Sequence, residues 1–119
     1  MGQTVRFQEI LRRLAIIDES ALEQHAGLGL GQAGARVLDA RTAELARVAA
    51  VAATGAPEVC LEWSVTRALA AGATEEEITG VLLAIAPVAG LGRVVSAVPG
   101  LATGLGYDVE TALMETDDP

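Results

Sequence analysis

One central stretch of the sequence decides the fold, and it reads Pro57-Glu-Val-Cys-Leu-Glu-Trp-Ser-Val-Thr-Arg-Ala-Leu-Ala-Ala-Gly72. Proline suits the first position of a helix, where its missing N–H group costs nothing, and glycine suits the left-handed residue just past a helix end. The stretch therefore predicts a helix that starts at Pro57 and ends before Gly72. It also holds the only cysteine and the only tryptophan of the chain, Cys60 and Trp63, so a reactive site is sought here first.

The predicted helix has two different sides. At 3.6 residues per turn, residues three, four and seven positions apart share a side. One side combines a thiol, an indole, a hydroxyl and a guanidinium, from Cys60, Trp63, Ser64 and Arg67. The other is apolar and carries Leu61, Val65, Ala68 and Leu69. We expect the apolar side to face a core and the polar side to line a site.

Helical patterns also precede the central stretch. Apolar residues at helical spacing predict an amphipathic helix over residues 4–17 and a short helical turn over 18–24. His25 and a glycine-rich connection follow, and a histidine in such a loop is expected to be solvent-exposed. Asp39 is a suitable N-cap for a helix that runs to about residue 54.

The patterns after the central stretch are helical as well. Thr74 and Glu77 form a capping box at the start of a helix that Pro87 is expected to end. Residues 88–105 predict either two short helices or one helix kinked at Pro99, and Asp108 caps a last turn or two. No stretch alternates with period two, so the sequence predicts an all-α protein of about six helices.

The composition bounds the size of the core. The chain has 119 residues, of which 51% are hydrophobic and 3% aromatic. This length predicts a single domain over residues 1–119. A core built from Ala, Val, Leu and Ile buries little area per side chain, at roughly 25 cal/mol for each Å² of apolar surface. We therefore expect a homo-oligomer, in which partner subunits complete a thin core.

The charge argues against nucleic acid as a partner. The formal net charge is −8, and the eight basic residues are all arginines scattered along the chain. Phosphate backbones would be repelled by such a surface. Alanine, glycine and arginine are plentiful while lysine and asparagine are absent, a bias that suggests a GC-rich bacterial genome.

Cysteine usage and hydropathy favour a cytoplasmic protein. A single cysteine forms no intramolecular disulfide, and no secretory signal is visible at the N-terminus. Residues 78–107 are almost uncharged, but Arg93 and several prolines and glycines interrupt them. Neither half reaches the ~20 apolar residues that a membrane span needs, so buried helices are expected.

Glu44 is the acidic candidate for a site. It lies four and seven residues before Val48 and Val51, at the edge of the apolar stripe of the helix that begins after Asp39. One interpretation is an ordinary ion pair with Arg47 or Arg41 at helical spacing, worth a few tenths of a kcal/mol. The other is a partly desolvated carboxyl group that serves as a general acid or base.

The order of these motifs resembles one family. Leu38-Asp-Ala-Arg-Thr-Ala-Glu-Leu45, Arg67-Ala-Leu-Ala-Ala-Gly-Ala-Thr-Glu-Glu-Glu-Ile78 and Ala89-Gly-Leu-Gly-Arg-Val-Val-Ser-Ala97 are similar to the carboxymuconolactone decarboxylase-like, or alkylhydroperoxidase D-like, family. The resemblance covers about residues 38–107. It implies a small all-α bundle that assembles into dimers, trimers or hexamers.

The reactive groups of the family are only partly present. The peroxidase branch carries Cys-x-x-Cys-x-x-x-His before the Ala-Leu-x-x-Gly run, and counting back from that run puts Pro57 at the first cysteine, Cys60 at the second and Ser64 at the histidine. Glu44 falls near the family's glutamate. The decarboxylase branch uses that histidine and an arginine where this chain has Ala43. A resolving thiol and a base are therefore missing.

Three hypotheses remain open. The first is an enzyme or binding protein for a small carboxylated or cyclic metabolite, with Glu44, Ser64 and Cys60 as reactive groups and Trp63 and Arg67 as contacts for a ring and a carboxylate. The second is single-cysteine reduction of hydroperoxides through Cys60, and the third is an inactive oligomeric scaffold. Lyase or isomerase chemistry and peroxidase chemistry are both left open, and no cofactor or metal is expected. For Trp63, packing in a core or a subunit interface competes with ligand contact.

Overall fold

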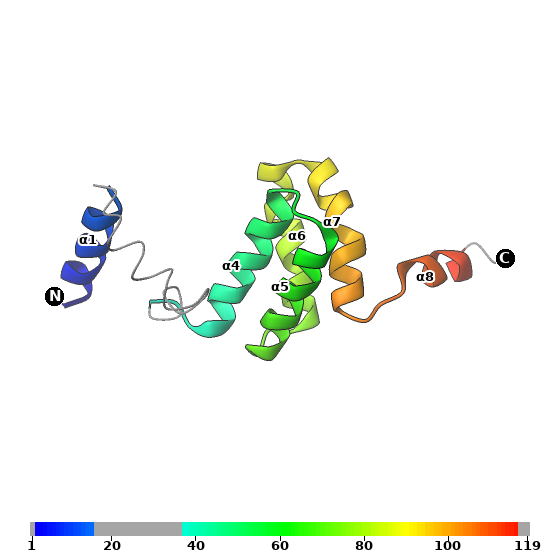
Figure 1. Cartoon of the computed structure of the whole chain (residues 1–119), viewed down its shortest axis with the longest axis horizontal. Coiled ribbons are helices and arrows are strands. Elements are labelled where there is room, and N and C mark those ends of the chain that lie inside the picture. The colour runs from blue at the N-terminus through cyan, green and yellow to red at the C-terminus, as the bar shows by residue number, and fades with distance from the viewer. Residues whose placement is uncertain (1, 16–36, 117–119) are drawn as a thin grey trace. The chain divides into compact units, whose positions relative to one another are not determined.

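The computed structural model describes residues 2–15 and 37–116 of the chain. All six elements in these two ranges are α-helices, which confirms the all-α prediction for the described residues (Figure 1). The chain divides into two compact units, Met1–Asp39 and Ala40–Pro119. Each unit is described by itself.

α1 (Gly2–Ala15) is the described helix of the first unit. It agrees with the helix predicted over residues 4–17, starting two residues earlier. Its exposed apolar side chains recur at helical spacing and are Phe7, Leu11 and Leu14. The predicted turn over residues 18–24, His25 and the glycine-rich connection lie outside the described residues.

Four helices form the body of the second unit: α4 (Ala40–Ala53), α5 (Glu58–Ala70), α6 (Glu75–Ala89) and α7 (Leu91–Gly104). The central helix α5 packs mainly between α4 and α7, and both of those helices also pack on α6 (Figure 1). A last helix, α8 (Val109–Thr116), follows. The predicted central stretch is thus the helix with large contacts on two sides.

Several helix ends follow the predicted chemistry. Gly72, just past α5, has a φ of 96°, in the left-handed region that glycine adopts without strain. Thr74 and Glu77 close the predicted capping box at the start of α6. The carboxylate of Asp108 accepts a hydrogen bond from the backbone N–H of Thr111 at 3.1 Å, as expected of a residue that caps α8.

The prolines behave differently from the prediction at two places. Pro57 is the N-cap of α5 and not its first helical residue. Pro87 does not end α6, which continues to Ala89. A proline in the last turn removes only its own N–H group, so the helix can continue until Gly90, whose φ of 93° ends it. Pro99 lies inside the single helix α7, so the helix is not broken there and the predicted alternative of one helix applies.

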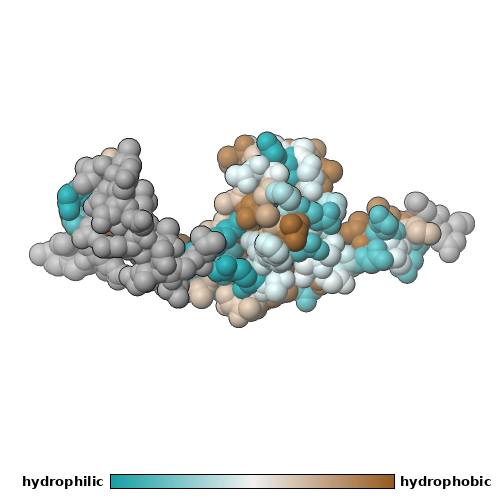
Figure 2. All heavy atoms as spheres, in the orientation of Figure 1, coloured by the Kyte–Doolittle hydropathy of each residue, from teal (hydrophilic) through white to brown (hydrophobic). Residues whose placement is uncertain are grey.

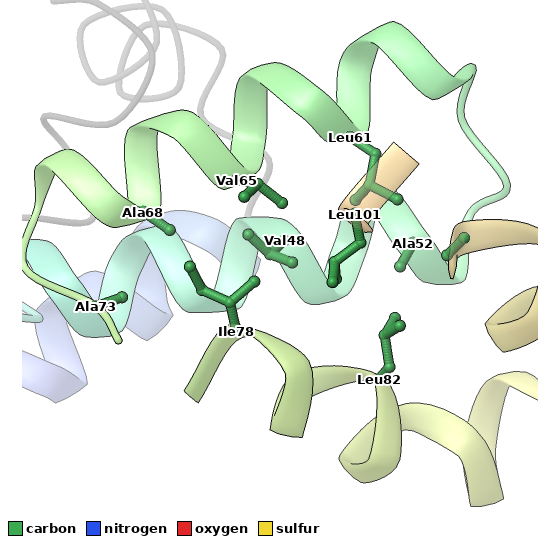
Figure 3. Packing of buried hydrophobic residues seen from close by; sticks show 10 residues of the cluster. Val48, Ala52, Leu61, Val65, Ala68, Ala73, Ile78, Leu82 and Leu101 are labelled. Atoms are coloured by element: carbon green, nitrogen blue, oxygen red, sulfur yellow. The ribbon is translucent and has the colours of Figure 1, made fainter. Parts of the chain in front are cut away.

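The core of the second unit lies between the four body helices. The largest fully buried side chains of the described residues are Val48 of α4, Val65 of α5 and Ile78 of α6. Figure 3 shows these residues pointing toward one another, together with Leu82 of α6 and Leu101 of α7. The predicted apolar side of α5 is confirmed at three of its four positions, because Leu69 is exposed while Leu61, Val65 and Ala68 are buried.

Two glycines let α7 approach α5 closely. A Cβ atom added to Gly104 would lie 2.8 Å from Cβ of Val65, and one added to Gly100 would lie 3.0 Å from the backbone oxygen of Glu58. At both distances the added Cβ atom would force the neighbouring atom to move. Because these two residues have no side chain, the backbones of α5 and α7 can approach closely, as they do at small residues in other close helix pairs.

Apolar side chains are exposed where α6 meets α7. Figure 2 shows hydrophobic residues at this end of the four-helix body. The exposed residues of the two helices there are Leu83, Val88, Leu91 and Val95. No helix in the described part of the chain is long and apolar enough to cross a membrane.

Candidate functional site

The site is built around Glu44, which α4 carries toward α5. Glu44 is only 9% exposed. Its Oε1 atom accepts hydrogen bonds from Nη1 of Arg47 at 3.3 Å and from Nη2 of Arg67 at 3.2 Å. Arg47 lies one turn further along α4, whereas Arg67 comes from α5. A buried carboxylate is thus held by two arginines from two helices, which is the usual requirement for burying a charge.

Two polar atoms near this ion pair have no partner. The second carboxylate oxygen of Glu44, Oε2, and the hydroxyl oxygen of Ser64, Oγ, are both buried without a hydrogen bond. Ser64 lies one turn before Arg67 on α5, and Arg67 contacts Glu44. Leaving a buried polar group unpaired costs about 1–3 kcal/mol. The folded chain therefore carries two destabilising groups at one helix pair.

The side chains that were predicted to form one polar side of α5 differ in their exposure. Ser64 is buried, whereas Trp63 is 65% exposed and Cys60 is partly exposed. Adjacent residues of a helix point about 100° apart, so Trp63 and Ser64 cannot both face α4. Packing of Trp63 in the core of this chain is therefore excluded, whereas a subunit interface and ligand contact both stay predictions. Arg67 contacts Glu44, Ser64 is buried one turn before Arg67, and Trp63 lies on the outside of α5.

The pairing of the arginines was predicted only in part. The ion pair of Glu44 with Arg47 is confirmed. Arg41 instead pairs with Glu77, which ties the start of α4 to the capping box of α6. Arg67 and Glu44, which the sequence analysis assigned to the same candidate site, are in direct contact although they are 23 positions apart and belong to different helices. Arg47 was not predicted as a site residue, although its spacing of three from Glu44 was visible.

Two guanidinium groups meet one carboxylate at this site. Arg47 and Arg67 both pair with Glu44. Arg67 keeps about half of its side chain exposed. A guanidinium group is suited to bind an anion such as a carboxylate.

Two carboxyl groups at helix starts have lowered pKa values. The pKa of Glu77 is lowered, mainly by the hydrogen bond from the backbone N–H of Thr74 and also by Arg41. The pKa of Asp108 is lowered by hydrogen bonds from Thr111. Both shifts belong to helix caps, which stabilise the charged form of a carboxylate. They indicate structural roles for these two residues.

Neither a metal site nor the main cavity coincides with the predicted residues. Residues 2–15 and 37–116 contain no group of three His, Cys, Asp or Glu side chains that could hold a metal ion. A cavity of about 450 Å³ lies among α5, α7 and the start of α8, with a lining that includes Glu58, Val98, Tyr107 and Asp108. None of Glu44, Cys60, Trp63, Ser64 and Arg67 lines it. Its charged lining is acidic, so it would repel the anions that the Glu44 site favours.

Comparison with known proteins identifies the family. The family model described as "Carboxymuconolactone decarboxylase family" matches residues 19–102. The chain belongs to this family. The match begins earlier and ends slightly earlier than the predicted range of 38–107. No curated protein and no solved structure matched the chain.

Proposed function

We propose that the protein binds or acts on a small carboxylated, cyclic metabolite at the contact of α4 and α5, without the histidine that its family uses. The observation that carries this proposal is the pair of buried, unpartnered atoms, Oε2 of Glu44 and Oγ of Ser64, beside two arginines. Natural proteins leave few buried polar groups unpaired, and those they leave are often explained by a function.

The charges support a carboxylate as part of the ligand. Arg47 and Arg67 place two guanidinium groups against the one carboxylate of Glu44. A guanidinium binds a carboxylate through two parallel hydrogen bonds, which gives both strength and orientation. Arg67 is the more exposed of the two arginines and therefore suits this contact.

Trp63 supports a ring as the second part of the ligand. Its indole is largely exposed and lies one helical turn from Arg67. Aromatic faces stack on planar or cyclic groups. A ligand with a ring against Trp63 and a carboxylate on Arg67 uses both side chains at the spacing that α5 provides.

Thermal denaturation with a panel of aromatic and lactone carboxylic acids tests the proposal. A ligand present at 100 times its Kd adds about 2.7 kcal/mol to the free energy of unfolding. We expect a rise in Tm with at least one acid of the panel. The rise should be absent with the neutral amide of the same acid, because an amide has no negative charge to pair with the guanidinium group of Arg67.

Two arginine variants make the test specific. Arg67→Gln should abolish the ligand-dependent rise in Tm. Arg93→Gln removes the same charge from α7, where Arg93 bonds the backbone oxygen of Thr54, and should keep the rise. Equal shifts in the two variants, or no shift with any acid in the unmodified protein, would contradict the proposal. The absence of both binding and peroxide consumption would favour the oligomeric scaffold.

Single-cysteine reduction of hydroperoxides through Cys60 is the second candidate. Cys60 is partly exposed and lies in the first turn of α5, so a small molecule in the solvent can reach its sulfur atom. The thiolate would attack the peroxide oxygen and become a sulfenic acid, releasing the alcohol, and an added thiol would then reduce the sulfenic acid. Peroxide consumption with a thiol donor should then fall in Cys60→Ser, and equal rates in both proteins would exclude this activity.

A further inference from the structure

We infer that the cavity among α5, α7 and the start of α8 binds a small organic cation. Its volume of about 450 Å³ lies within the roughly 300–1,000 Å³ that is usual for small-molecule sites. The residues of the Glu44 site do not line this cavity, so the inference is independent of the proposed function. The part of the lining from Thr103 onward lies beyond residue 102, where the family match ends. The cavity is thus built in part by residues outside the matched region.

The charged side chains that line the cavity are all carboxylates. They belong to Glu58 of α5, Asp108 and Glu110 of α8. Asp108 caps α8 and accepts hydrogen bonds from the backbone N–H and the hydroxyl group of Thr111, at 3.1 and 2.6 Å. The carboxylates of Glu58 and Glu110 make no ion pair or hydrogen bond with the described part of the chain. Two uncompensated carboxylates on one cavity favour a cation as the ligand.

The helix ends at the cavity keep this preference. The last turn of α7 contributes Ala102 and Thr103 to the lining, and the C-terminal end of a helix carries a partial negative charge. The start of α8 carries a partial positive charge, which the Asp108 cap balances. The negative charges of Glu58 and Glu110 therefore remain available to a ligand.

The uncharged lining selects an organic cation over a metal ion. A metal ion needs several converging ligand side chains, and no such group of three exists among the described residues. Val98 and Val109 provide apolar contacts instead, which a hydrated metal ion does not use. Tyr107 adds an aromatic ring that is 59% exposed, and aromatic faces attract ammonium groups. An alkylammonium ion can use the charge, the ring and the apolar wall together.

A ligand can reach this cavity directly from solvent. Glu58, Tyr107 and Glu110 are all exposed, so no covering side chain has to move. Exposure to water also weakens each ion pair, because the charges are screened and were already hydrated. We therefore expect modest affinity, with selectivity for positive charge as the property that identifies the site.

Butylammonium, butanol and butyrate test the inference on the full chain. The three molecules share an unbranched carbon chain and differ in charge. Kd values come from isothermal titration at constant ionic strength. We expect butylammonium to bind about tenfold more tightly than butanol, which corresponds to about 1.4 kcal/mol, and butyrate to bind least. Magnesium ions should bind more weakly than butylammonium, because they use neither the ring nor the apolar wall.

Matched variants assign the cation to the cavity. Glu58→Gln and Glu110→Gln each remove one lining carboxylate and should raise the Kd of butylammonium about three- to fivefold. Glu62→Gln and Glu115→Gln remove the same charge from the same two helices without lining the cavity, and should leave the Kd unchanged. Tyr107→Leu should also weaken binding, whereas Tyr107→Phe keeps the ring and should retain it. Circular dichroism checks that each variant keeps its helices.

Each contrary result overturns a defined part of the inference. Equal binding of butylammonium and butanol would show that the cavity does not select charge. Equal Kd values in the lining variants and their controls would mean that the cation associates with the acidic surface as a whole. Binding of magnesium as tight as that of butylammonium would exclude the organic class of ligand. None of these results bears on the Glu44 site, which is tested with acids.

Discussion

At the scale of the residue, Ser64 is the side chain whose position carries the most information. It faces inward on α5, and its hydroxyl group has no partner in the folded chain. A serine in this position lowers stability, since alanine would fill nearly the same space without a polar atom to bury. A group that destabilises the free protein is expected where binding requires it.

Replacing Ser64 should therefore stabilise the free protein. We expect Ser64→Ala to raise the free energy of unfolding by about 1 kcal/mol beyond its gain in helix propensity. Urea denaturation followed by circular dichroism measures this. Ser96→Ala is the matched control, because Ser96 is an exposed serine of α7 and reports propensity alone. A lower stability of Ser64→Ala would mean that its hydroxyl group is bonded in solution.

The sequence predicted the members of the site better than their arrangement. Glu44, Ser64 and Arg67 were chosen from their spacing and from the family resemblance, and the structure puts Arg67 in contact with Glu44 and buries Ser64 one turn before Arg67. Periodicity could not decide between Ser64 and Trp63 as the inward residue. That choice depends on the rotation of α5 about its axis, which contacts with other helices determine.

At the scale of the element, the pairing of α5 with α7 depends on two glycines. Gly104→Ala would put a methyl group 2.8 Å from Cβ of Val65, a fully buried residue of the core. We expect it to lower the free energy of unfolding by about 1–3 kcal/mol, as overpacking does. Gly80→Ala is the control, since nothing lies within 4 Å of its added Cβ.

The two glycine variants should change stability in opposite directions. Gly80 lies inside α6, where alanine is favoured over glycine by roughly 0.5–1 kcal/mol. Thermal denaturation of both proteins under the same conditions makes the comparison. A stabilised Gly104→Ala would show that α7 can move away from α5 at no cost.

The capping box at the start of α6 should make the free energy of unfolding depend on pH in the acidic range. The pKa of Glu77 is below its ordinary value of 4.5, because the charged form accepts the hydrogen bond of Thr74 and pairs with Arg41. Its stabilisation is therefore complete above pH 4.5 and is lost as the pH falls through the lowered pKa. Between pH 4.5 and the lowered pKa of Glu77, the free energy of unfolding should decrease as the pH decreases.

Glu77→Gln should make this acid dependence weaker. Free energies of unfolding measured from pH 7 down to pH 3 should fall less steeply in the variant than in the unmodified protein. Glu76→Gln, one residue before, leaves the capping box and the pair with Arg41 in place and serves as the control. Parallel pH curves for all three proteins would exclude the capping box as the cause.

Element boundaries were predicted well where a side chain bonds the backbone and less well at prolines. The box of Thr74 and Glu77 is a local pattern, so its sequence was sufficient. Pro87 was expected to end a helix and Pro99 either to break or to kink one, and α6 and α7 each continue past their proline. Whether a helix continues past a proline depends on packing partners, and these are distant in the sequence.

At the scale of the whole molecule, the exposed apolar end of α6 and α7 suits a homo-oligomer. Residues 78–107 carry a single charged residue, Arg93, in a chain with a net charge of −8. Two copies can therefore approach through this segment with little repulsion between like charges. Exposed apolar patches of this kind often mark protein interfaces.

Light scattering coupled to size-exclusion chromatography tests this assembly. We expect a mass of two or more chains for the unmodified protein and a shift toward the monomer for the double variant Val88→Glu and Leu91→Glu, because charges there oppose contact between copies. Thr79→Glu adds a charge to an exposed polar position of α6 and should leave the mass unchanged. A monomeric unmodified protein would contradict the expected oligomer.

The close contact of α7 with α5 also governs the chemistry of the distant side of α5. The close fit of Val65 against Gly104 fixes the rotation of α5 about its own axis, and this rotation also buries Ser64 and brings Arg67 to Glu44. A full exchange of Ser64 for Trp63 would need a turn of about 100°. A bulkier residue on α7 could therefore turn α5 and disturb the contact of Arg67 with Glu44 from the opposite side of the helix.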